Sequence, residues 1–220
     1  MNETKYITET RDVKDFDQVK LREYGELIIT QGEQESITIE ADEELMPRIQ
    51  TEVVNRKLTI AIDQDWIAQL TTHLTTRKIK YNLQLKNIQK LEISGAASVK
   101  AANLTAERLE LKVSGAANVN VSQLQTRRLE VELPGTGNLD LAGRADEQTV
   151  VVSGAGMYRA PHLETQKTSI EITGLGKATV WAVTDLDVTI TGFGSVRFYG
   201  EPRVKRNIHG MGNLQGLGIP

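Results

Sequence analysis

The amino-acid sequence predicts an all-β protein, a right-handed parallel β-helix in which a strand–turn–strand unit repeats along most of the chain. Three observations lead to this fold class. A glycine followed two residues later by glycine or alanine recurs at steps of 18 to 20 residues. Apolar and polar residues alternate on both sides of each recurrence, which is typical of strands with one buried face. The chain has 220 residues and no cysteine, so it can bury a core without disulfides or a thiolate metal site.

Residues 1–62 are predicted to form irregular N-terminal β coils. Turn signals between the alternating runs stand at Gly25, Gly32 and Asn55. The segment 43–53 is expected to be a brief helical turn or loop, because Pro47 interrupts it. The pattern breaks over residues 63–76, which we interpret as an insertion.

The regular coils are predicted over residues 77–220, as about seven coils in a single domain that covers residues 1–220. Alternation at residues 79–85 is expected to lead into the first of them. The residues that mark the coils are the turn glycines Gly95, Gly115, Gly135, Gly154, Gly174, Gly192 and Gly210. We expect them to be structural turns, because a corner between two strands needs either positive φ or a backbone too crowded for a side chain.

Apolar residues occupy the positions two and four before each glycine and four after it. The only exception four before is Arg206, in the last copy. Further inward anchors are predicted in the polar stretch that ends each unit, namely Leu104, Leu124, Leu163 and Val183. Stacking such units as a parallel ladder aligns the inward residues into a continuous core, and parallel crossovers are overwhelmingly right-handed.

The sequence indicates no catalytic, cofactor-binding or metal-binding residues. The Gly-x-Gly turns lack the third glycine of a dinucleotide fingerprint, and the three histidines, His73, His162 and His209, share no register. A formal net charge of -3 without a basic face argues against nucleic acid as a partner. No apolar run approaches the roughly 20 residues of a transmembrane helix, so we expect no transmembrane segment.

Asp146 and Asp185 occupy equivalent positions two coils apart, as the carboxylates of a glycoside hydrolase in a solenoid would. Because basic residues do not share their register, we interpret them as part of a solvated acidic face. A carbohydrate-binding or carbohydrate-active protein that uses a lateral groove stays the alternative function.

Surface contacts are the positive functional indication. Leu175, Phe193 and Met211 occupy the middle of their turns and predict an exposed apolar ridge for contact with a second copy, a surface protein or a glycan. The aromatic residues that could form a ligand-facing patch are Tyr158, Trp181, Phe193, Phe198 and Tyr199, although Tyr158 and Phe198 stand at inward positions. An amide ladder is expected at Asn118, Asn138 and Asn213.

The run ITQGEQESITIEADEELMPRIQTEVVNRKLTI, followed by LEISGAASV, LKVSGAANV and VVSGAGMYRA, resembles the putative auto-transporter adhesin head domain (GIN domain) family. The resemblance extends from about Thr10 to Gly212. It implies a bacterial right-handed parallel β-helix, exported to the periplasm, cell envelope or exterior, and it implies no particular activity. The leading hypothesis is therefore a non-enzymatic surface protein, an adhesin or scaffold. The first residues lack the apolar core of a secretory signal, so either no such segment exists or it has been removed.

Overall fold

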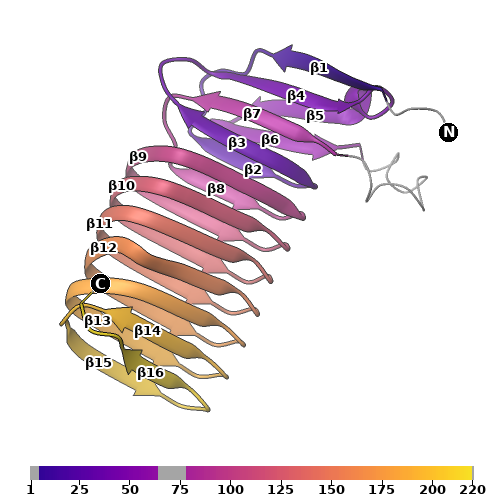
Figure 1. The fold of residues 1–220 in the computed structure, drawn as a ribbon. Coiled ribbons are helices and arrows are strands. Elements are labelled where there is room, and N and C mark those ends of the chain that lie inside the picture. Colours follow the sequence, from indigo (N-terminus) through magenta and orange to yellow (C-terminus); the bar gives the residue numbers. More distant parts are fainter. Residues whose placement is uncertain (1–4, 64–77, 220) are drawn as a thin grey trace.

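The computed structural model describes residues 5–63 and 78–219, which form a long stack of parallel β-coils closed at one end by antiparallel strands (Figure 1). The strands are β1 (Tyr6–Arg11), β2 (Gln18–Leu21), β3 (Gly25–Gln31), β4 (Ser36–Asp42), β5 (Ile49–Val54), β6 (Lys57–Ile62), β7 (Lys80–Leu85), β8 (Lys90–Ile93), β9 (Ala97–Val113), β10 (Asn118–Leu133), β11 (Asn138–Val152), β12 (Met157–Ile172), β13 (Lys177–Ile190), β14 (Ser195–Tyr199), β15 (Arg203–Ile208) and β16 (Asn213–Gly216). The predicted all-β solenoid is confirmed. Its hand and the count of seven coils stay predictions.

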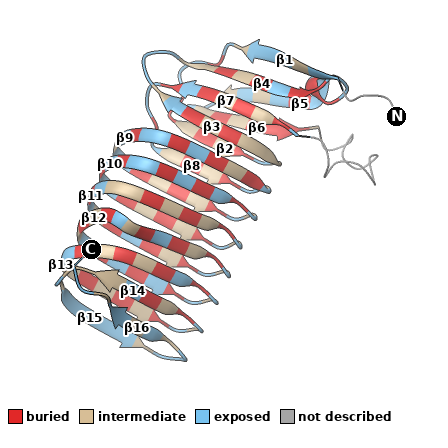
Figure 2. Ribbon diagram, viewed as in Figure 1, coloured by how far each residue is buried: buried red, intermediate tan, exposed pale blue. Residues whose placement is uncertain are grey.

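The body of the solenoid consists of long curved strands, each running from one glycine turn to the next. Register partners repeat one coil apart, as Val99, Val119 and Leu139 do in β9, β10 and β11. These inward positions are almost completely buried, and buried and exposed residues alternate along the coils of β9 to β13 (Figure 2). The apolar columns predicted from the alternation are therefore confirmed as one continuous core.

The polar stretch of each unit is not a separate loop, because the strand bends and continues through it. Three of its predicted anchors are buried, namely Leu104, Leu124 and Leu163. The prediction for Val183 is wrong, since its side chain is 39% exposed. The reason is a bulge in β13, where Val183 and Thr184 together stand opposite Gln166 of β12.

The N-terminal coils do not stack in the order of the sequence. Strand β3 lies between β7 and β9, and β2 lies between β6 and β8. Residues 79–85 lead along the chain into β8 and the first regular turn, as expected, and their alternating apolar side chains point inward, but β7 stacks on β3 and not on β9. The chain first forms the coil of β2 and β3, passes beyond it, and returns outside it as β6 and β7.

Antiparallel strands cover the N-terminal end of the stack. β4 pairs with both β7 and β1, and β5 pairs with β6 through a tight turn at Asn55 and Arg56, both with positive φ. The expected helical turn is the 3-10 segment Met46–Arg48, and it is followed by a strand that sequence analysis missed. Of the predicted insertion 63–76, residues 64–76 lie outside the described residues.

Candidate functional site

The turn glycines lie directly against the backbone of the preceding coil. A Cβ on Gly115 would stand 2.1 Å from the carbonyl oxygen of Gly95, and a Cβ on Gly154 would stand 2.2 Å from that of Gly135. Neither has a positive φ. Of the two explanations that the sequence left open, close approach of the backbone accounts for these glycines.

The ladder of backbone hydrogen bonds continues through the turns. The amide of Leu175 donates to the carbonyl oxygen of Gly154 at 3.0 Å, and the amide of Phe193 donates to that of Gly174 at 3.1 Å. With its amide held in this way, the middle residue of each turn lies at the outer corner of the coil. Its side chain is therefore presented to solvent.

At this corner the structure places three large apolar side chains, which we call the ridge: Leu175, Phe193 and Met211. Their exposed fractions are 63%, 59% and 76%. They belong to successive turns, so the ladder spacing makes the ridge about 10 Å long. The same position in the earlier coils carries Ala96, Ala116, Thr136 and Ala155.

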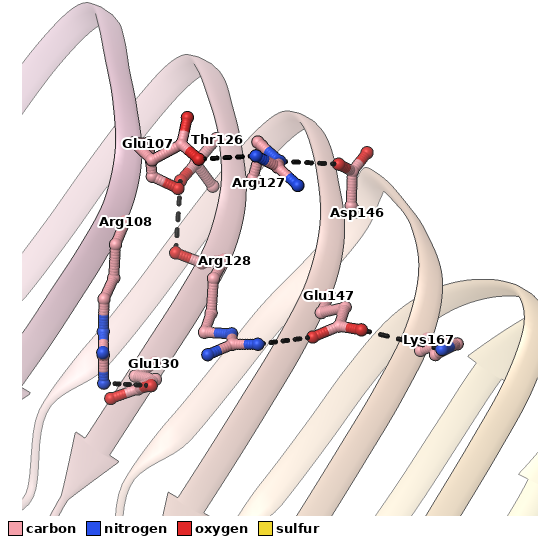
Figure 3. A network of polar contacts seen from close by, with 9 residues as sticks. All are labelled: Glu107, Arg108, Thr126, Arg127, Arg128, Glu130, Asp146, Glu147 and Lys167. Carbon is pink, nitrogen blue, oxygen red and sulfur yellow. Dashed lines mark hydrogen bonds and ion pairs between the residues drawn. The ribbon is translucent and has the colours of Figure 1, made fainter.

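A second lateral face carries alternating charges. Figure 3 shows Arg127 between Glu107 and Asp146, at 2.7 Å and 3.8 Å, and Glu147 joined to basic residues of both neighbouring coils. Those bonds to Glu147 are 3.2 Å from Arg128 and 3.6 Å from Lys167. These side chains are well exposed, so each pair contributes little stability alone.

The interpretation of Asp146 and Asp185 as part of an acidic face without basic residues in register is wrong. Asp185 stands in register with Lys167 on one side and Arg203 on the other, and its carboxylate lies 2.8 Å from Arg203. Asp146 pairs with Arg127. Parallel stacking brings equivalent positions of successive repeats side by side. At these positions successive repeats carry side chains of opposite charge, so the charges pair.

A lateral recess of about 470 Å³ lies across the coils of β10 to β13. Its lining includes Gln123, Gln125, Ala142, Gly143, Arg144, His162, Glu164 and Trp181. The recess forms where the coils change length: β12 passes from Ala160 to Glu164 while β13 passes only from Val180 to Trp181. Sequence analysis did not identify this recess, although the steps of 19 and 18 residues between turn glycines signal the changes in length.

A buried polar cluster is joined to the recess through the backbone of Trp181. Gln148 Nε2 donates to Thr168 Oγ1 at 2.9 Å and to Thr165 Oγ1 at 3.2 Å, and Tyr158 Oη donates to Gln148 Oε1 at 2.7 Å. Thr165 Oγ1 also donates to the carbonyl oxygen of Trp181 at 2.8 Å. Burial strongly raises the pKa of Tyr158, so this phenol stays a neutral donor.

The remaining predicted features are only partly assembled. Asn138 Nδ2 donates to Asn118 Oδ1 at 2.9 Å, which confirms that step of the amide ladder. Asn213 is not part of it, because its register partner is Ser195. His162 lines the recess, whereas His209 is exposed near the last turn and His73 lies outside the described residues.

Within residues 5–63 and 78–219, no group of three or more His, Asp or Glu side chains is placed to hold a metal ion. Over the same residues, no helix has the length and apolar character needed to span a membrane.

The fold is an all-β solenoid of parallel stacked coils. The chain belongs to the family described as "Putative auto-transporter adhesin, head GIN domain", which matches residues 15–202. This confirms the resemblance seen in the sequence, and the family indicates an adhesin-like role at a surface. A search of curated proteins found no match.

Solved structures share the fold along nearly the whole chain. A putative adhesin from Bacteroides fragilis NCTC 9343 is 22% identical, with a TM-score of 0.90 and 98% of each chain covered. A putative adhesin from Parabacteroides distasonis ATCC 8503 is 22% identical, with a TM-score of 0.74 and the same coverage. A protein from the same organism described as a putative lipid binding protein is 20% identical, with a TM-score of 0.74 and 96% of each chain covered. At these identities the likeness shows the fold alone.

Proposed function

We propose that this protein is an exported, non-enzymatic adhesin-type protein that makes contact through the ridge of Leu175, Phe193 and Met211. The observation that carries the proposal is the exposure of these three large apolar side chains on successive turns, where the earlier coils have only small residues. Exposed apolar side chains gathered at one place are typical of interaction surfaces. The adhesin family supports the same kind of role.

The partner that we propose for the ridge is a second copy of the chain. Two ridges can pack side by side, because each is a straight row of side chains at the spacing of the coils. Three side chains cover far less than the roughly 800 Å² per partner of a stable complex, so a single contact is expected to be weak. Many copies on one surface would strengthen it through multivalency.

The test is the light-scattering mass of the purified protein over a tenfold range of concentration. We expect the mean mass to rise above the 24.4 kDa of one chain as concentration increases. Phe193→Ser combined with Met211→Ser should reduce this rise. The matched control is Ala96→Ser combined with Ala116→Ser, at the same turn position in coils without the ridge. A mass of one chain at every concentration would contradict contact between copies.

A further inference from the structure

We propose that the lateral recess across β10 to β13 is a binding site for a neutral oligosaccharide. This inference goes beyond the proposed function and does not depend on it, because the recess and the ridge share no residue. Along the strands the two are separated by roughly 20 to 30 Å, since the ridge stands one residue after the turn glycines and the recess residues stand seven to ten after them. Four features of the recess point to this ligand class.

The first feature is an aromatic wall. Trp181 is partly buried and borders the recess, and its register partner in the next coil is Tyr199. The face of an indole ring is electronegative, so it attracts the weakly positive C–H groups on one face of a sugar ring. Gly200, which follows Tyr199, has a φ of +94°, and a Cβ there would come within 2.1 Å of the carbonyl oxygen of Ala182, so the chain can turn at this point only with glycine.

The second feature is a balanced set of planar polar groups. Arg144 and Glu164 are register partners on β11 and β12, and their side chains lie 3.4 Å apart. Gln123 and Gln125 of β10 add amides that can both donate and accept. Because the one guanidinium is already paired with a carboxylate, the recess favours a neutral hydroxyl-rich ligand over an anion such as phosphate.

The third feature is the pairing of every strand below the recess. β11 is paired on both sides with β10 and β12, and β12 is paired on both sides with β11 and β13. Neither strand therefore has a free edge to which an extended peptide could be added, although the bulges leave single residues such as His162 without a register partner on β13. Recognition must come from the side chains, which suits a sugar.

The fourth feature is rigid support. Gln148 and Thr168 interrupt an inward column that carries Leu129 on one side and Leu186 on the other, and they do so only in β11 and β12. Through Thr165 this buried cluster holds the carbonyl of Trp181. A buried cluster in which every polar group is hydrogen-bonded holds the surrounding backbone in one geometry. A binding site needs such a fixed geometry, whereas a column of packed apolar side chains does not.

The experiment uses the full chain with Trp66→Phe, so that Trp181 is the only tryptophan. The probes are cellotetraose, xylotetraose, maltotetraose, mannotetraose and chitotetraose, with a tetramer of galacturonic acid as the acidic comparison. At least one neutral probe should change the Trp181 fluorescence saturably, with a dissociation constant of about 1 mM or lower. Calorimetry on the chain with Trp66 intact gives an independent affinity.

By calorimetry, Trp181→Ala and Arg144→Met should each weaken binding of that probe by about tenfold or more, and Trp181→Phe should retain part of it. Phe193→Ser, on the ridge, is the control that should bind like the wild type. No saturable signal with any neutral probe would overturn the proposal, as would binding that Trp181→Ala leaves unchanged. Binding of the acidic tetramer alone would also overturn it.

Discussion

At each turn glycine, a carbonyl oxygen of the neighbouring coil stands close to the place that a Cβ would occupy. This close approach repeats along the solenoid. The sequence identified every one of these glycines from the repeat. It could not decide between positive φ and crowding, because both require glycine. Only the stacked coils reveal that the carbonyl of one coil stands where the next would place a methyl group.

Gly154→Ala should therefore destabilise the protein by about 2–4 kcal/mol or prevent folding, because backbone must move in two coils. Gly32→Ala is the matched control: nothing lies within 4 Å of its added methyl group, and its free energy of unfolding should change by less than about 0.5 kcal/mol. Urea unfolding followed by circular dichroism compares the two. Equal midpoints would contradict the close-contact explanation.

The buried polar cluster gives a second prediction at this scale. Gln148→Leu makes one of the two polar positions in this column apolar but leaves the Tyr158 hydroxyl without its acceptor, which should cost about 1–3 kcal/mol. Adding Tyr158→Phe should recover part of that loss, because no unpaired hydroxyl is left. A double-mutant cycle measured by urea unfolding checks this, and strictly additive losses would show that the two side chains are not coupled.

Whole coils are joined by charge ladders as well as by backbone hydrogen bonds. Lys20, Glu92, Lys112 and Glu132 are register partners on four stacked strands and alternate in sign. Lys20 lies 2.7 Å from Glu92, and Lys112 lies 2.5 Å from Glu132. A shift of one coil would place like charges side by side, so these ladders favour one register.

This ladder predicts a loss of stability in acid. Burial raises the pKa of Glu92, but the hydrogen bond from Lys20 and the nearby lysine charges outweigh burial and lower that pKa below its ordinary 4.5. A lowered carboxyl pKa stabilises the fold above 4.5 and loses that contribution as pH falls through the folded-state value. Urea midpoints should therefore depend less on pH over the acid range in Glu92→Gln than in the wild type. An unchanged acid dependence would contradict this role.

The stacking order of the strands could be predicted from the sequence only in part. Strands, turn glycines and inward columns from β8 onward follow from alternation because each coil contacts its sequence neighbour. The placement of β3 between β7 and β9 leaves no trace in periodicity, since β3 and β7 carry the same alternating pattern. The recess was missed for a related reason: its side chains come from four coils and meet only through their bulges.

The two ends of the whole molecule differ. Antiparallel strands cover the N-terminal end, whereas the outer edge of β15 faces no further strand among the described residues. Arg206 of β15 stands in register with the buried Val188, at a position that is apolar in the other coils. A charge at an inward position of an edge strand discourages further pairing.

Arg206→Ile should therefore promote end-to-end association, because it extends the apolar column to an open edge. Sedimentation velocity should show species larger than those of the wild type, and their amount should grow with concentration. Arg203→Ile, on the outward face of the same strand, is the control. Equal behaviour of the two variants would show that Arg206 does not protect this end.

The claim that the ridge makes the contact between copies can be tested most directly by a cysteine scan, because the chain has no cysteine. Single cysteines are placed at the middle position of each turn, at Ala96, Ala116, Thr136, Ala155, Leu175, Phe193 and Met211, and the protein is oxidised under mild conditions. We predict disulfide-linked dimers for cysteines at 175, 193 and 211, and much less for those at 96 and 116. Equal crosslinking at every turn, or crosslinking confined to the earlier coils, would contradict the ridge as the contact surface.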